Sequence, residues 1–205
     1  MNRLLTAILT FILSALVATA TETDAASVLD KMSKAFQKAG TLSASYTMSS
    51  DGHKSSGEMI LSGDRFRLTS PQMTIWYDGK TQWTYNSDIR EVNITEPTAE
   101  ELAETNPFVI ISMFRNKYNA RLMKSAPGSY RIDFTPRNNA DMTVKRAIVT
   151  ISSTTFMPTD MAVTVDGDQT VAVHIDSLVQ GKNYPANTFV FNKKSYPKAE
   201  IVDLR

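Results

Sequence analysis

The side chains that could support catalysis or bind a metal are few in this chain of 205 residues, which has two histidines and no cysteine. His174 and Asp176 stand two positions apart, so a strand would place their imidazole and carboxylate on one face. Two such groups do not complete a metal site, and a solvated strand face is the simpler interpretation. The common nucleophile, zinc-protease and nucleotide-binding motifs are missing from the sequence. We therefore expect a protein that is not an enzyme and needs neither a cofactor nor a metal.

The most prominent feature is instead an apolar segment. Residues 108–114 read Phe-Val-Ile-Ile-Ser-Met-Phe, which is too short to span a membrane and lacks polar alternation. A buried strand and a short helix both fit this pattern. We favour the helix, because Asn106-Pro107 suits a helix start and residues 115–117 supply basic side chains at its end. The segment could complete the core as a plug or cover a cavity as a lid, and the pattern leaves both open.

The N-terminus has the layout of a secretory signal peptide. Arg3 precedes an apolar run over residues 4–18, and Ala18-Thr19-Ala20 matches a cleavage site. We expect residues 1–20 to be removed on export and residues 21–205 to form a single soluble domain, which is large enough to bury a core without disulfides.

The charge balance argues against nucleic acid as a partner. The chain carries 22 basic and 21 acidic residues. Since Arg3 is the one charged residue of the leader, the mature chain has 21 of each and a formal net charge of zero. A nucleic-acid-binding domain needs a basic face instead.

The periodicity predicts a mainly β domain with some α-helix. Thr23 or Asp24 can cap a helix that runs to Ala39, and Gly40 suits its C-terminal end. From Thr41 onward apolar and polar residues alternate, with turn signals between the runs, as in an antiparallel meander. Thr95 or Thr98 could cap a further short helix through Leu102. Later strands are expected near Tyr118–Lys124, Ser129–Thr135, Thr143–Ser152, Met161–Asp166, Thr170–Ser177 and Thr188–Phe191.

Several segments, in order along the chain, resemble the LolA family of periplasmic carriers for outer-membrane lipoproteins. The longest is Tyr77-Asp78-Gly79-Lys80-Thr81-Gln82-Trp83-Thr84-Tyr85-Asn86, close to a family signature. The others are Leu42-Ser43-Ala44 with Tyr46, Gly57-Glu58-Met59-Ile60-Leu61, Arg65-Phe66-Arg67-Leu68, Pro71, Asn106-Pro107-Phe108-Val109-Ile110-Ile111 and Phe189-Val190-Phe191. Together they cover most of the mature chain.

The resemblance implies a fold, a function and partners. The fold is an incomplete, strongly curved antiparallel β-barrel with helices covering its open side. The function is to shield the acyl chains of lipoproteins in an apolar cavity and to carry them across the periplasm from the inner to the outer membrane. The implied partners are acylated lipoproteins, an inner-membrane ABC-type release complex and, in some systems, an outer-membrane acceptor. We expect a monomer.

The alternation of side chains along each strand predicts the residues that line this cavity. They are Phe66, Leu68, Ile75, Tyr77, Trp83, Phe108, Ile111 and Phe114. The prediction takes Phe66 and Leu68 to face inward, as the resemblance implies.

One family feature is not matched. In well-known members an arginine before a proline, on the strand that follows a Gly-x-Leu element, latches the lid. Here the corresponding residues are Ser62-Gly63-Asp64, and neither Arg65 nor Arg67 is in register to replace the family arginine.

Two other functions remain as alternatives. A protein of the same fold could bind or sense another lipid or a glycolipid in the periplasm, and a secreted enzyme is a third hypothesis. The lipid that copurifies with the protein would distinguish a lipoprotein carrier from a binder of another lipid. An enzyme would instead be recognised by turnover of a substrate.

Overall fold

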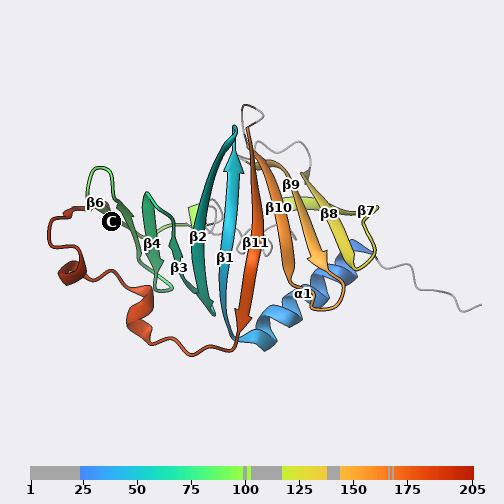
Figure 1. Cartoon of the computed structure of the whole chain (residues 1–205), viewed down its shortest axis with the longest axis horizontal. Helices are drawn as coiled ribbons and strands as arrows, with labels where there is room; N and C mark the ends of the chain where they lie inside the picture. Colours follow the sequence, from blue (N-terminus) through green and yellow to red (C-terminus); the bar gives the residue numbers. More distant parts are fainter. Residues whose placement is uncertain (1–23, 99–100, 103–116, 138–143, 166, 168) are drawn as a thin grey trace, which may run out of the picture.

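The computed structural model describes residues 24–98, 101–102, 117–137, 144–165, 167 and 169–205. One curled sheet of twelve strands holds this part of the chain together (Figure 1). The predicted signal peptide and the predicted helix at 106–114 lie outside the described residues.

Helix α1 (Ala25–Ala39) begins and ends where the sequence predicts. The Asp24 carboxylate accepts a hydrogen bond from the Ser27 backbone N–H at 2.6 Å, which satisfies one free donor of the first turn. Gly40 follows the last turn with φ of 65°, a conformation that glycine adopts without strain. The apolar side of α1 is buried, including Val28, Leu29 and Met32.

The strands are short at both ends of the sheet and long at its centre. Their bounds are β1 (Thr41–Ser50), β2 (His53–Ser62), β3 (Arg65–Thr69), β4 (Met73–Tyr77), β5 (Gln82–Asn86), β6 (Glu91–Thr95), β7 (Tyr118–Met123), β8 (Ser129–Pro136), β9 (Val144–Ser152), β10 (Pro158–Val165), β11 (Thr170–Gln180) and β12 (Glu200–Asp203).

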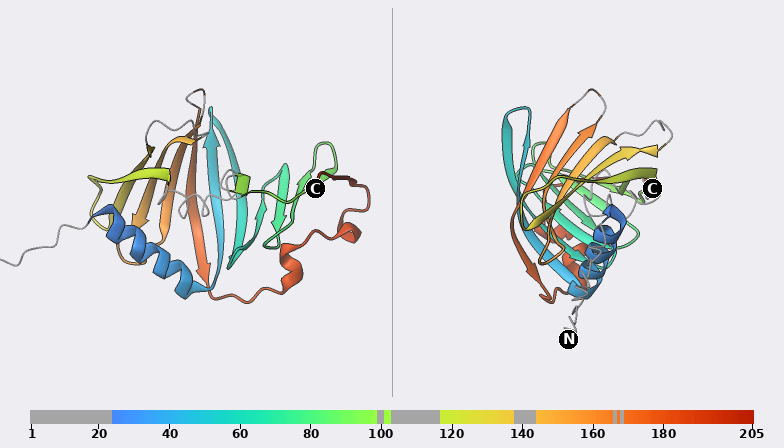
Figure 2. Two further views of the ribbon diagram at one scale, coloured as in Figure 1. Left: turned by 180° about the vertical axis from the view of Figure 1, so that it is seen from behind. Right: turned by 90° about the vertical axis from the view of Figure 1, so that its right-hand side faces the viewer.

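Their order in the sheet is β12-β6-β5-β4-β3-β2-β1-β11-β10-β9-β8-β7. Neighbours pair antiparallel except β12 and β6, which are parallel. The sheet curls without closing, and β12 and β7 are its two edges (Figure 2). The predicted curved, incomplete antiparallel barrel is thus confirmed as one open, curled sheet.

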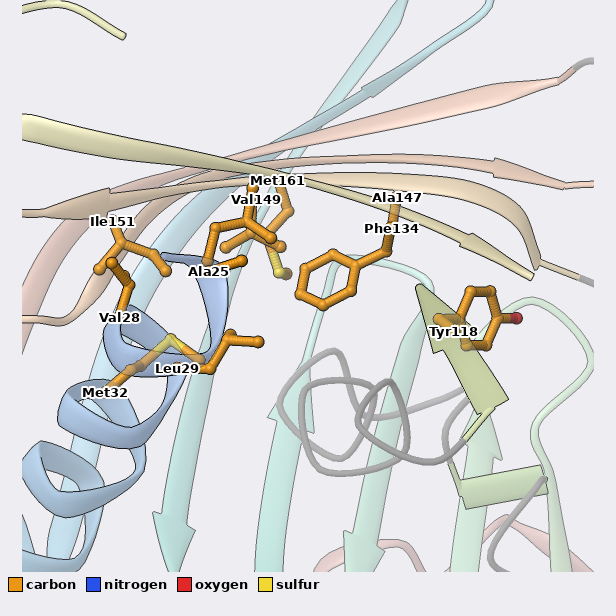
Figure 3. Close-up of a cluster of buried hydrophobic side chains, with 11 residues drawn as sticks. Ala25, Val28, Leu29, Met32, Tyr118, Phe134, Ala147, Val149, Ile151 and Met161 are labelled. Carbon is orange, nitrogen blue, oxygen red and sulfur yellow. The ribbon is translucent and has the colours of Figure 1, made fainter. Parts of the chain in front are cut away.

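We call the face on which α1 lies the inner face. Over β7–β10 the helix and the sheet enclose the largest buried cluster, where Val28, Leu29 and Met32 meet side chains such as Phe134 and Val149 (Figure 3). The prediction that helices cover the open side is not confirmed, since among the described residues α1 packs on one half of the sheet.

The opposite, outer face is covered at the other end by residues 181–199, which we call the C-terminal strap (Figure 1). The strap includes the 3-10 turns η3 (Ala186–Phe189) and η4 (Lys193–Ser195). Phe189 is fully buried, and the rings of Phe191 and Tyr196 lie 5.6 Å and 5.5 Å from the ring of Trp76 on β4. The strap then leads into β12 beside β6.

The strand predicted near Thr188–Phe191 is wrong, and the final strand β12 was not predicted. The alternation of Phe189 and Phe191 arises because both rings pack on the sheet from outside, not because the segment joins the hydrogen-bonded ladder. In the residues that the structure describes, no helix is long and apolar enough to cross a membrane.

Candidate ligand-binding face

Four of the predicted cavity residues come together on the inner face of β3 and β4. Phe66 is paired directly with Tyr77, and Leu68 with Ile75. The rings of Phe66 and Tyr77 lie 5.4 Å apart, and Phe66 and Ile75 are almost completely buried. Leu68 remains half-buried beside them. The prediction therefore placed these four side chains on one face correctly, whereas their contact with a ligand stays a prediction.

A capping box places one more apolar side chain on this cluster. The Glu101 carboxylate accepts from the Thr98 backbone N–H at 2.7 Å, and the Thr98 hydroxyl accepts from the Glu101 N–H at 3.3 Å. This reciprocal pair starts a helical turn, and Leu102 in that turn packs against the cluster of Phe66, Ile75 and Tyr77. The helix start predicted at Thr95 or Thr98 is therefore at Thr98.

Trp83 lies on the opposite face, which corrects the prediction. It pairs directly with Trp76, while Tyr77 pairs with Gln82 and Ile75 with Thr84. Four residues connect Tyr77 to Gln82. When a turn between two paired residues has an even number of residues, the inward positions change from odd to even residue numbers. Odd-numbered residues face inward on β4, whereas even-numbered residues do so on β5. The remaining predicted residues, Phe108, Ile111 and Phe114, lie outside the described residues.

The apolar surface continues from β3 across the centre of the sheet. Met59 on β2 pairs with Leu68, and Ala44 on β1 pairs with Met59. Tyr46, paired with Gly57, lies so close to it that a Cβ on Gly57 would be 2.4 Å from the tyrosine hydroxyl oxygen. Burial raises the pKa of Tyr46, so its hydroxyl stays neutral.

The inner face becomes polar on β5 and β6. Its inward positions there are Gln82, Thr84 and Asn86 on β5, and Glu91, Asn93 and Thr95 on β6. The Asn93 amide donates to the Glu91 carboxylate at 2.9 Å. This polar surface was missed because alternation along the sequence predicted that Trp83 faces inward on β5. The length of the four-residue turn before β5 is the signal that could have revealed the correct inward residues.

The two arginines nearest the family latch position point away from this face. Arg67 pairs with Trp76, and its Nε donates to the Thr69 hydroxyl at 3.3 Å. The guanidinium of Arg65 lies 5.0 Å from the ring centre of Phe189, in the strap. Both are therefore on the outer face, in agreement with leaving the latch unassigned.

A hollow of about 470 Å³ opens on the outer face over β1, β2 and β8–β11. Its lining includes Thr47, Asp160, His174 and Asp176. His174 Nδ1 lies 2.7 Å from an Asp160 oxygen, and this hydrogen bond raises the pKa of the imidazole. His174 and Asp176 thus share a face, as predicted. Nevertheless, the described residues contain no group of three or more histidine, cysteine or acidic side chains placed to hold a metal ion.

The arrangement on the inner face suits binding of an apolar ligand. Phenylalanine, leucine and methionine side chains form an apolar layer on the inner face of β2–β4. Through β1 this layer is continuous with the cluster that α1 covers. A ligand buried against these side chains gains about 25 cal/mol for each Å² of its own apolar surface that leaves water.

Comparisons with known proteins agree with this geometry. A family model described as outer membrane lipoprotein carrier protein LolA matches residues 13–167. No curated protein sequence matches the chain significantly.

Three solved structures illustrate the likeness in fold. An uncharacterized conserved protein from Thermus thermophilus is 10% identical with a TM-score of 0.60, covering 87% of this chain and 98% of that one. A putative outer membrane lipoprotein-sorting protein domain from Vibrio parahaemolyticus is 10% identical, with coverages of 83% and 98% and a TM-score of 0.46. The MucA/MucB complex from Pseudomonas aeruginosa is 12% identical, with coverages of 82% and 62% and a TM-score of 0.44. At such identities the likeness to the Thermus protein establishes the fold alone.

Proposed function

Because this chain belongs to the LolA family of outer membrane lipoprotein carrier proteins, we propose that it carries lipoproteins through the periplasm by holding their acyl chains against its inner face. The protein acts by binding and release, without chemical change to its cargo. Export through a cleaved signal peptide would bring it to that compartment.

The observation that carries the proposal is the apolar surface on β2–β4, at the end of the sheet that α1 leaves uncovered. Phe66, Ile75 and Tyr77 form its floor, and the half-buried Leu61 and Leu68 pack beside them. A sheet that curls without closing can present such a floor to a ligand from its concave side (Figure 2).

The energetics explain why such a carrier is needed. Burying a methylene group is worth about 0.8 kcal/mol, so a chain of about 16 carbons gains roughly 12 kcal/mol before the costs of binding. A lipoprotein with several acyl chains would therefore leave a membrane very slowly without an escort. We further propose that an inner-membrane ABC-type complex loads the protein and that the outer membrane, with or without an acceptor protein, receives the cargo.

The test is a pair of aspartate substitutions on opposite faces of the sheet. We expect Leu68→Asp to weaken binding of a fluorescent diacylated peptide at least tenfold, because an unpaired carboxylate on the inner face opposes hydrocarbon burial. Ile60→Asp is the matched control. Ile60 pairs with Arg67 and is also half-buried, but it faces outward.

Each variant is also unfolded in urea, so that a loss of binding is interpreted only at near-normal stability. Equal losses from both substitutions would contradict an inner-face site. Failure of the wild-type protein to bind any acylated peptide would contradict the carrier, and a glycolipid copurified in its place would favour the same-fold binder or sensor instead.

A further inference from the structure

The inner face joins two surfaces of different chemistry without a gap. Tyr77 and Ile75, from the apolar floor, are paired directly with Gln82 and Thr84. Gln82 and Thr84 are paired in turn with Thr95 and Asn93 on β6. Since neighbouring strands lie about 4.8 Å apart, the polar surface begins one strand from the floor and extends for about 5 Å more.

Among the residues that the structure describes, this polar surface carries hydrogen-bonding groups but neither lysine nor arginine. The inward strand positions of β2–β6, read from the register, include neither lysine nor arginine. Arg65 and Arg67 lie on the outer face, and Lys80, in the turn after β4, pairs with Glu96 at 3.1 Å.

The charges nearby are negative. Glu91 faces inward and accepts from Asn93. At the floor, Asp64 and Asp78 lie close enough to Tyr77 that their charges, added to the larger effect of burial, raise the pKa of its hydroxyl. A phosphate placed here would meet carboxylates, and the described inward positions of β2–β6 offer no guanidinium or ammonium group to pair with it.

We propose that Thr84, Asn93 and Thr95 form a head-group subsite that accepts an uncharged, hydrogen-bonding head next to the acyl chains and excludes a phosphate. Peptide amides and sugar hydroxyls both have this chemistry, since they exchange hydrogen bonds with threonine hydroxyls and the asparagine amide. The inference rests on the proposed function, because it assumes that hydrocarbon lies on the adjoining floor. It adds that the protein separates lipidated peptides or glycolipids from the phospholipids of the same membrane.

The experiment compares three ligands with identical acyl chains and different heads. They are a diacylglyceryl peptide amide without net charge, a diacylglycerol glycoside and phosphatidic acid, each used to displace a fluorescent fatty acid from the full mature chain. We expect the peptide amide, the glycoside or both to bind at least tenfold more tightly than phosphatidic acid. Which of the two binds better identifies the source of the head.

A lysine introduced into the subsite should reverse this preference. We expect Thr84→Lys to improve phosphatidic acid binding, relative to the uncharged ligands, at least tenfold. Thr95→Lys, at the end of β6, provides a second position if the first variant folds poorly. Ser49→Lys adds the same charge on the outward side of β1 and should leave the ratio unchanged.

The outcomes separate the two proposals. If no acylated ligand displaces the fatty acid, the proposed function fails. If the wild-type protein binds all three ligands equally well, or if a folded lysine variant keeps the wild-type ratio, the head-group subsite is refuted while lipid binding stands.

Discussion

Asp133 shows how a single charged residue is accommodated in the sheet. Its carboxylate, on the outer side of β8, is only 5% exposed and accepts from Arg146 Nε at 2.8 Å and from Arg121 at 3.3 Å. The hydrogen bond from Arg146 lowers the pKa of Asp133 more than burial raises it. One carboxylate therefore ties β8 to both of its neighbours in the half of the sheet that packs on α1.

We predict that Asp133→Asn lowers the free energy of unfolding at pH 7 by about 1 to 2 kcal/mol. This is at the low end for charged hydrogen bonds, because both arginines stay accessible to water. Since the folded pKa is depressed, the stabilisation is fully present above the unfolded value of about 3.9 and is lost as the pH falls through the folded pKa. Urea midpoints of both proteins from pH 7 to pH 3 should therefore converge on the acid side.

Asp203→Asn is the control for this titration. Arg205 lowers the pKa of Asp203 to about 2, but the two residues are close neighbours on an exposed end of the chain. Their contact can form in the unfolded chain too, so the substitution should change stability little at any pH. A constant difference between wild type and Asp133→Asn down to pH 3 would contradict the assigned ion pair.

At the scale of elements, the sheet is covered on opposite faces at its two ends. Helix α1 packs on the inner face over β7–β10, and the C-terminal strap packs on the outer face over β3–β5 (Figures 1 and 2). On the outer face, Trp76 of β4 therefore packs against the rings of Phe191 and Tyr196, and Tyr85 of β5 packs against Tyr196. The inner side of the same strands carries the buried cluster of Phe66, Ile75 and Tyr77, to which we assign the ligand.

We predict that Phe189→Ala destabilises the protein by about 3 to 5 kcal/mol, because it empties a fully buried site. The two tryptophans of the chain, Trp76 and Trp83, both lie on the outer face of β4–β5. Their fluorescence should shift to the red in the variant if the strap loosens. Val190→Ala, at a neighbouring position that is 37% exposed, should cost less than about 1 kcal/mol. Equal effects of the two substitutions would show that the strap is not anchored through Phe189.

At the scale of the whole molecule, the ionisable groups that invite a catalytic interpretation are separated from the proposed binding face. The hydrogen-bonded His174 and Asp160 lie on the outer face, in the hollow, and their side chains are 61% and 50% exposed. His53 is exposed at the start of β2.

We predict that His53→Ala and His174→Ala bind a diacylated peptide with wild-type affinity, because neither imidazole adjoins the apolar floor. Equilibrium binding of the fluorescent peptide measures this, and urea unfolding confirms that each variant is folded. Weaker binding by either folded variant would place a histidine in the site and reopen the question of an enzyme.

Local features of the sequence determined much of the fold. Asp24 and Gly40 set the ends of α1, because capping depends on residues within one turn. Alternation identified most strands, and it placed Phe66, Leu68, Ile75 and Tyr77 on one face, because the side-chain period within a strand is two. The ordered motifs also identified the family correctly.

Tertiary structure decided the features that depend on how distant segments meet. The four-residue turn after Tyr77 places Trp83 on the outer face. The length of a turn determines whether the odd- or the even-numbered residues of the next strand face inward. The strap and the parallel pairing of β12 with β6 follow from contacts between segments far apart in the chain, which no local period encodes. The polar surface beside the apolar floor exists for the same reason, because pairing of β4, β5 and β6 brings Thr84, Asn93 and Thr95 to the inner face.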